Sequence, residues 1–206
     1  MSLTVWLTFV VAAVLISVSP GAGAVNTMSN GLQYGVRRSV PSILGLQLGY
    51  GAQILLVGAG LGAIIASSTL ALSVIKWLGV AYLIWLGIQK WREPVVTHSE
   101  SAPAETSNQK RFWQSAFVNL TNPKATVFLV ALFPQFLVAG EPHGPQLATM
   151  GITLVLVDCM VMLGYALLAS QLYRFMTTPR RQKRMNQVFG SLFVVAAVAL
   201  ASFRRT

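Results

Sequence analysis

Six long apolar segments constrain the fold of this chain more than any other feature of the sequence. They cover approximately residues 3–33, 40–66, 70–91, 112–138, 146–173 and 185–203. A helix needs roughly 20 apolar residues to cross the hydrocarbon core of a bilayer, and every segment meets or approaches that length. The sequence therefore predicts an all-α integral membrane protein with six transmembrane helices.

Composition and charge agree with a membrane protein. Hydrophobic residues make up 54% of the chain and charged residues only 10%, whereas a soluble domain has about 25% charged residues. The net charge of +10 lies in clusters between the apolar segments, which orients a membrane protein, whereas nucleic-acid binding needs basic residues on a solvated face. The single Cys159 provides neither a disulfide framework nor a zinc cluster. We expect a lipid environment, no nucleic acid and no metal.

The positions of lysine and arginine predict the orientation. The loops after the first, third and fifth segments hold eleven of the fifteen, and such loops face the cytoplasm. Both termini are therefore expected on the side of the membrane opposite the cytoplasm, although Arg204 and Arg205 oppose this. Ala22-Gly23-Ala24 imitates a signal-peptidase site, but no basic residue precedes Arg37. A signal peptide begins with a positive region, so we expect no cleavage there.

The chain divides into two halves of three segments each. Residues 93–111 include a run rich in Pro, Ser, Thr and Glu, which predicts a cytoplasmic linker between a first repeat, 1–92, and a second repeat, 112–206. Because three is an odd number, equivalent halves would be inverted relative to each other. We therefore expect two inverted three-helix repeats.

The first and fourth segments carry matching interruptions, Ser19-Pro20-Gly21 and Asn122-Pro123. Serine and asparagine are favoured N-caps, and proline suits the first position of a helix. Each break is therefore predicted to begin a second half-helix whose free N–H groups attract a carboxylate near the bilayer centre. The alternative for a single break is a proline kink with local packing, but two matched breaks favour a binding site.

Asp158 is the only acidic residue within an apolar segment. An intramembrane carboxylate is by default a functional candidate and often a proton relay, so we expect Asp158 to couple transport to protons. The alternative is a structural ion pair with Lys124, which lies in the fourth segment.

The second segment carries glycines four residues apart, which indicate close helix packing; they are Gly45, Gly49, Gly58 and Gly62. Gln47 and Gln53 in the same segment face either a cavity or a partner helix. Nothing indicates an enzyme, because His98 and His143 lie in loops and no nucleophile has an evident base. No cofactor is expected. The alternatives to a transporter are a passive small-solute channel, an intramembrane enzyme and a structural scaffold.

Several motifs together resemble the LysE/RhtB family of amino-acid exporters over essentially the whole chain. They are Ser19–Asn26, the glycine-rich second segment, Lys76–Gly87, Val118–Lys124, Leu132–Phe136 and Phe189–Phe193. The family usually shows Pro-Gly-Pro in the first break, where this chain has Ala22 as the third residue.

The resemblance implies a bacterial inner-membrane exporter of small neutral amino acids or derivatives, driven by proton exchange. Its partners would be the substrate, protons and lipid, and a homo-oligomer is compatible with the sequence. Together with the N-cap argument, the resemblance assigns substrate binding to the two breaks and proton coupling to Asp158. The substrate-binding candidates are Ser19, Pro20, Gly21, Asn26, Asn122, Pro123 and Lys124.

Overall fold

The computed structural model describes residues 1–67, 69–92, 106–138, 140–169, 171 and 178–202. These residues form seven helices and contain no strand, which confirms the all-α prediction. The helices are α1 (Leu3–Val18), α2 (Ala22–Ser67), α3 (Thr69–Arg92), α4 (Asn108–Leu120), α5 (Pro123–Phe136), α6 (His143–Leu167) and α8 (Pro179–Ser202).

Among the described residues, two helices contain a run long and apolar enough to cross a membrane on its own, one run lying within Ala22–Gly60 of α2 and the other in α6. The pair α4 and α5, bent by 50° at its break, provides a third candidate span when the two helices count as one. Together they agree with a membrane protein. The arrangement of six spans in two inverted repeats stays a prediction.

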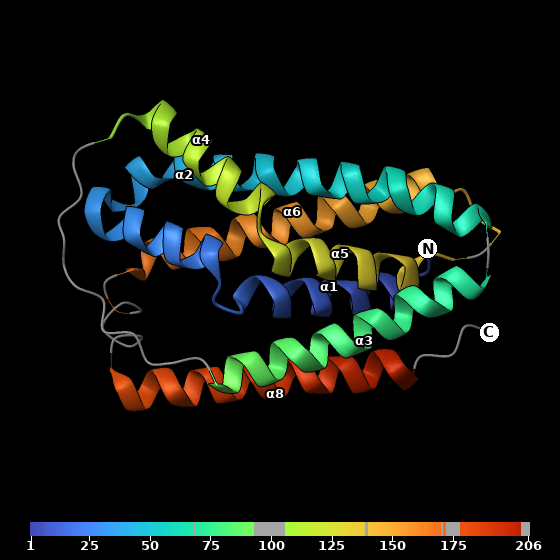
Figure 1. Ribbon diagram of the computed structural model, residues 1–206. Helices are drawn as coiled ribbons and strands as arrows, with labels where there is room; N and C mark the ends of the chain where they lie inside the picture. The colour runs from blue at the N-terminus through green and yellow to red at the C-terminus, as the bar shows by residue number, and fades with distance from the viewer. Residues whose placement is uncertain (68, 93–105, 139, 170, 172–177, 203–206) are drawn as a thin grey trace.

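The helices lie along a common long axis, and α1 begins at the same end of the molecule at which α8 ends (Figure 1). The chain reverses inside α2 at Gly35, whose φ of 72° is a conformation that glycine adopts without strain. The expected loop between residues 33 and 40 is therefore a one-residue turn, because both flanking helices extend to meet it. As a result, Arg37 and Arg38 are helical.

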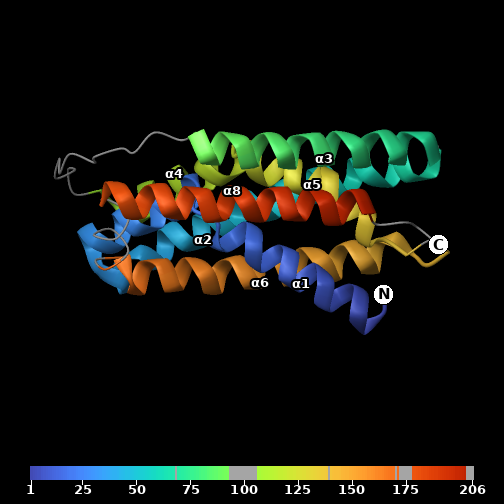
Figure 2. The same ribbon diagram turned by 90° about the horizontal axis from the view of Figure 1, so that it is seen from below.

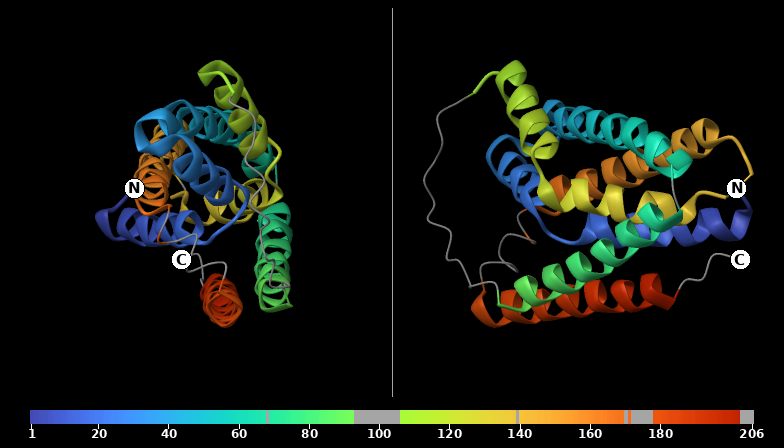
Figure 3. Two further views of the ribbon diagram at one scale, coloured as in Figure 1. Left: turned by 90° about the vertical axis from the view of Figure 1, so that its left-hand side faces the viewer. Right: turned by 45° about the vertical axis from the view of Figure 1, so that its right-hand side comes forward.

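The helices pack in a pattern that leaves one pair at the side of the molecule. α2 packs against α4 and α6, and α1 packs against α6 and α5. α3 packs against α8 and, less extensively, α5. Figure 2 shows α3 and α8 running side by side, and Figure 3 shows this pair at one side of the molecule. The centre of the fold is therefore built by α1, α2, α4, α5 and α6.

Gly45 and Gly49 let α2 approach α4 closely, as the sequence predicted. A Cβ atom added at Gly45 would lie 2.0 Å from the Phe112 carbonyl oxygen, and one at Gly49 would lie 2.2 Å from that of Ala116. Gly58 makes only an ordinary contact with Leu147. The surroundings of Gly62 lie outside the described side chains. The first glycine pair therefore fixes α4, and with it the start of the second break.

An aromatic cluster fixes α1 against α5. Phe9 is fully buried, and its ring makes edge contacts with Phe133 at 5.7 Å and Phe136 at 5.2 Å between centroids. Edge-to-face pairs of this kind contribute about 0.5–1.5 kcal/mol beyond their burial. The two helices that carry the breaks are thereby held in contact.

The first break differs from the prediction. Ser19 was expected to begin the following helix, but it ends the preceding one. Ser19 is the C-cap of α1, and its N–H donates to the Leu15 carbonyl at 3.1 Å. Its extended conformation is the one that a following proline favours. The next helix begins only at Ala22, where the Gly21 carbonyl accepts from the N–H of Val25. The prediction that Ser19 and Pro20 begin the half-helix was therefore wrong, because Gly21 takes the N-cap position.

The second break follows the prediction. Asn122 is the N-cap of α5, and its side-chain oxygen accepts from the N–H of Lys124 at 3.1 Å. Pro123 occupies the first helical position, where its missing N–H costs nothing. At the other end of the fourth segment, α4 already begins at Asn108, so residues 108–111 are helical although the sequence placed them in the linker.

Candidate functional site

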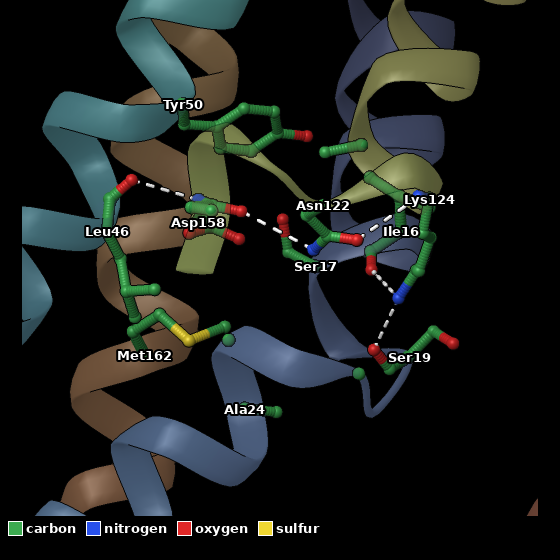
Figure 4. Close-up of a pocket in the computed structure, with 14 residues that line it drawn as sticks. Ile16, Ser17, Ser19, Ala24, Leu46, Tyr50, Asn122, Lys124, Asp158 and Met162 are labelled. Atoms are coloured by element: carbon green, nitrogen blue, oxygen red, sulfur yellow. Dashed lines mark hydrogen bonds between the residues drawn. The ribbon is translucent and has the colours of Figure 1, made fainter. Parts of the chain in front are cut away.

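The two breaks face each other across a small buried cavity of about 40 Å³ (Figure 4). Its walls come from α1, the start and the middle of α2, the α4–α5 break and α6. Fourteen residues line it: Ile16, Ser17, Ser19, Gly21, Gly23, Ala24, Leu46, Tyr50, Asn119, Asn122, Lys124, Ala125, Asp158 and Met162. Residues far apart in the sequence thus meet at one polar centre.

The cavity brings together five of the eight residues that the sequence singled out: Ser19, Gly21, Asn122, Lys124 and Asp158. Pro20 and Pro123 belong to the breaks but do not line the cavity. Asn26 lies elsewhere, where its amide donates to the hydroxyls of Ser42 at 2.9 Å and Ser115 at 2.8 Å. In this conformation Asn26 links α2 to α4 and does not contact the cavity.

Lys124 connects the two breaks directly. It follows the second break, and its ammonium group donates to the carbonyl oxygens of Ile16 at 3.0 Å and Ser19 at 2.6 Å, beside the first break (Figure 4). These carbonyls lie at the C-terminal end of α1, which carries partial negative charge. A cation there is stabilised by the helix and satisfies groups that the break leaves without helical partners.

Asp158 on α6 is buried, with 7% of its surface exposed. One carboxylate oxygen accepts from the Gln47 amide at 2.8 Å. Among the described residues Asp158 forms no ion pair with Lys124, which acts on it only as a charge at longer range. The direct pair that the sequence left open as an alternative is therefore replaced by a hydrogen bond to α2.

Sequence reasoning missed two tyrosines, Tyr165 beside the end of α1 and Tyr50 at the cavity. Tyr165 donates its hydroxyl to the Val18 carbonyl at 2.6 Å, and Tyr50 lines the cavity with 3% of its surface exposed. A buried tyrosine usually needs a hydrogen-bond partner, but the sequence alone does not reveal that the partner of Tyr165 is the end of α1. Tyr165 and Lys124 together bind three carbonyls at this helix end, those of Ile16, Val18 and Ser19.

Gln53, on α2, forms hydrogen bonds to the second break. Its amide donates to the carbonyl oxygens of Leu120 at 2.9 Å and Asn122 at 3.3 Å, and to the Thr126 hydroxyl at 2.8 Å. Gln47 and Gln53 therefore both make interhelical hydrogen bonds, one to the buried acid and one to the break. Backbone groups that a broken helix frees inside a membrane must find such partners.

The cavity also contains polar groups that the described residues leave unpaired. The hydroxyl oxygens of Ser17 and Ser19 are buried and have no partner with standard hydrogen-bond geometry among these residues, although the Ser17 hydroxyl lies close enough to the Asp158 carboxylate to interact with it. Buried polar groups normally have partners, so these two hydroxyls are available to a ligand. A volume of about 40 Å³ is far below the roughly 300–1,000 Å³ of small-molecule sites, so a substrate requires the helices to move apart.

The described residues contain no group of three or more His, Cys, Asp or Glu side chains that could hold a metal ion. The chemistry of the site therefore rests on one carboxylate, one ammonium group, hydroxyls and the ends of helices. Such a set is chemically able to bind a small charged molecule through hydrogen bonds and charge.

A helical membrane protein with a buried charged cavity between two broken helices has the features of a membrane transporter. The chain belongs to the LysE type translocator family, whose pattern matches residues 14–203. It is therefore a membrane protein of an amino-acid efflux family.

Curated relatives cover nearly the whole chain. It is 48% identical to an uncharacterized membrane protein of Vibrio cholerae over 98% of both chains, and 45% identical to the homoserine/homoserine lactone efflux protein of Salmonella typhimurium over 97% of both. It is 29% identical to the leucine efflux protein of an Enterobacter strain over 95% of this chain and 94% of that one. No solved structure matches the chain.

Proposed function

We propose that the protein exports small neutral amino acids or their derivatives from the bacterial cytoplasm, with homoserine and homoserine lactone as the first substrates to test and threonine as a further one. The names of the relatives support amino-acid efflux. The observation that carries the proposal is the cavity between the two breaks, where Lys124 and Asp158 present opposite charges. An amino acid carries the same two charges on its own backbone.

The substrate carboxylate is proposed to lie at the start of α2. Gly21, Gly23 and Ala24 line the cavity there, and the first N–H groups of a helix lack helical partners and carry partial positive charge. Lys124 lies within reach of the same region, since a Cβ atom on Gly21 would be 3.5 Å from its ammonium nitrogen. The substrate ammonium group is proposed to bind Asp158 and the Ser17 hydroxyl.

Asp158 is proposed to exchange a proton for the substrate. A buried carboxylate cannot remain both charged and unpaired at low cost, so loss of the substrate ammonium would favour uptake of a proton from the periplasm. Gln47 would hold the carboxylate in place during this exchange. Proton entry would thus be coupled to substrate exit.

Alternating access is proposed to occur between two inverted halves that together cross the membrane six times. Corresponding pairings support this arrangement: α2 packs on α4 as α1 packs on α6, and α3 pairs with α8. The turn at Gly35 and the start of α8 carry arginines (Arg37, Arg38, Arg180, Arg181). They support a cytoplasmic position for that end and periplasmic termini.

Counterflow in proteoliposomes tests the proposal. Purified protein is reconstituted with a panel of labelled amino acids, with and without a pH gradient, and labelled substrate should accumulate and respond to the gradient. A passive channel would instead release substrate without counterflow or dependence on the gradient. Asp158→Asn can still accept the Gln47 hydrogen bond, so it should fold but lose the response to pH. Cys159→Ser, the adjacent position outside the cavity, is the matched control.

Pro20→Ala tests the role of the first break. It should reduce transport more than the amount of folded protein in the membrane. An equal loss of both would support a simple kink. Retention of the full pH response by Asp158→Asn would show that another group couples the protons.

A further inference from the structure

The turn within α2 and the start of α4 lie at the same end of the molecule (Figure 1). Residues of these two segments line a second cavity. It measures about 500 Å³ and is lined by Tyr34, Arg38, Thr106, Ser107, Asn108 and Arg111. None of these residues lines the cavity at the two breaks. The Tyr34 hydroxyl and the Thr106 hydroxyl lie 3.1 Å apart and hold the two walls together.

Arg111 is the unusual feature of this cavity, because it is a cation with only 5% of its surface exposed. Its guanidinium carbon lies 3.9 Å from the centre of the Tyr34 ring, and one terminal nitrogen donates to the Asn108 side chain. The other two nitrogens, Nε and Nη1, have no hydrogen-bond partner among the described residues. A buried charge without a counter-charge is costly, and two of the three guanidinium nitrogens lack a hydrogen-bond partner among the described residues, so the position favours a bound anion.

The surroundings of Arg111 also favour negative charge. Arg38 lines the same cavity, and no Asp or Glu among the described residues does. The cavity adjoins the first turn of α4, where Ser107 is the N-cap, and the free N–H groups of a helix start attract anions. Stacking on Tyr34 fixes the plane of the Arg111 guanidinium, which leaves its edge for paired hydrogen bonds.

We propose that this cavity binds a phosphate group, supplied by the headgroup of an anionic phospholipid. A guanidinium group matches phosphate oxygens in geometry and charge, and basic pockets between membrane helices bind anionic headgroups. The apolar part of α4 begins directly after Arg111, and Trp113 is half exposed as residues at the membrane surface are. The cavity thus lies at headgroup depth and exceeds the size of a free phosphate ion.

Thermal unfolding of the purified full-length protein in neutral detergent tests this inference. Short-chain phosphatidylglycerol, phosphatidylcholine and inorganic phosphate are titrated separately, and phosphatidylglycerol should raise the Tm at the lowest concentration. Arg38→Gln should weaken its apparent affinity roughly tenfold, as expected when a charged hydrogen bond is lost. Arg37→Gln, on the neighbouring exposed position, should change the affinity less than about twofold.

Arg111→Gln with Lys110→Gln as its control repeats the comparison on α4. Since Arg111 is buried, this variant is interpreted only if it unfolds cooperatively without ligand; otherwise Arg38→Gln carries the test. Equal losses for Arg38→Gln and Arg37→Gln would overturn the proposal, because they would indicate general attraction to a basic surface.

Two further outcomes separate the sources of the phosphate. If inorganic phosphate stabilises the protein as strongly as the lipid and the same variants abolish the effect, the phosphate site is supported with a free ion as its ligand. If neither probe raises the Tm until Glu105→Gln is introduced, a carboxylate of the chain itself is the partner and the proposal fails. The readout is binding, so it does not depend on transport.

Discussion

Gly49 lies where α2 passes close to α4, and its replacement by alanine tests whether this contact holds the second break in place. The added Cβ atom would lie 2.2 Å from the Ala116 carbonyl oxygen and 2.9 Å from the Leu120 nitrogen. Both neighbours are backbone atoms, so no side-chain rotation relieves the overlap. α2 and α4 must therefore move apart, and Leu120 at the break must move with α4.

The magnitude of the effect follows from two opposing contributions. Extra atoms in a tight core cost about 1–3 kcal/mol, and a backbone clash belongs at the upper end, about 3 kcal/mol. Alanine has the better helix propensity, which returns about 1 kcal/mol. The expected net loss is about 2 kcal/mol, or roughly 4–8 °C in Tm for a chain of this size.

Gly51→Ala is the matched control, two residues further along the same helix. A Cβ atom there meets nothing within 4 Å, so only the propensity gain of about 1 kcal/mol applies, and the Tm should rise by roughly 2–4 °C. Thermal unfolding of both variants in the same detergent measures the difference. If Gly49→Ala were as stable as Gly51→Ala, the close contact between α2 and α4 would be refuted.

Three further substitutions test the remaining contacts by thermal unfolding. Gln53→Leu leaves the carbonyls of Leu120 and Asn122 without this donor and should cost about 2 kcal/mol; an unchanged Tm would show that other donors replace it. Asn122→Ala removes the N-cap of α5 and should cost about 1 kcal/mol, whereas Asn122→Ser should restore most of the loss. Gly190→Ala would place a Cβ atom 2.2 Å from the Trp91 ring and 2.7 Å from the Gly87 carbonyl oxygen and should cost about 1–3 kcal/mol by separating α3 from α8; an unchanged Tm would contradict this close contact.

The contacts across the cavity indicate what must change when it opens. Lys124 and Tyr165 hold the end of α1, while Gln53 holds the second break against α2. A substrate large enough to enter must displace some of these hydrogen bonds or replace them with its own. In the proposed mechanism, the substrate carboxylate would compete with the α1 carbonyls for Lys124, and substrate binding would thereby release the first break.

Several features of this protein could be predicted from the sequence because they depend on residues that are close together in the chain. The apolar segments indicated helices and a membrane, because segment length and composition decide both. Asn122-Pro123 indicated a helix start, because an N-cap and its proline act within three residues. The spacing of Gly45 and Gly49 indicated close packing, because positions four apart share one helix face. Asp158 indicated a functional site because burying a carboxylate in an apolar segment costs free energy.

Only the tertiary structure decided which groups meet. Ser19 and Pro20 suit a helix start as well as Asn122 and Pro123 do, yet Ser19 caps the end of α1 and the next helix starts after Gly21. The partner of Asp158 is Gln47, and Lys124 binds carbonyls more than a hundred positions away. Propensities act between neighbours in the chain, whereas these hydrogen bonds depend on how α1, α2, α5 and α6 pack, so no local pattern in the sequence contains them.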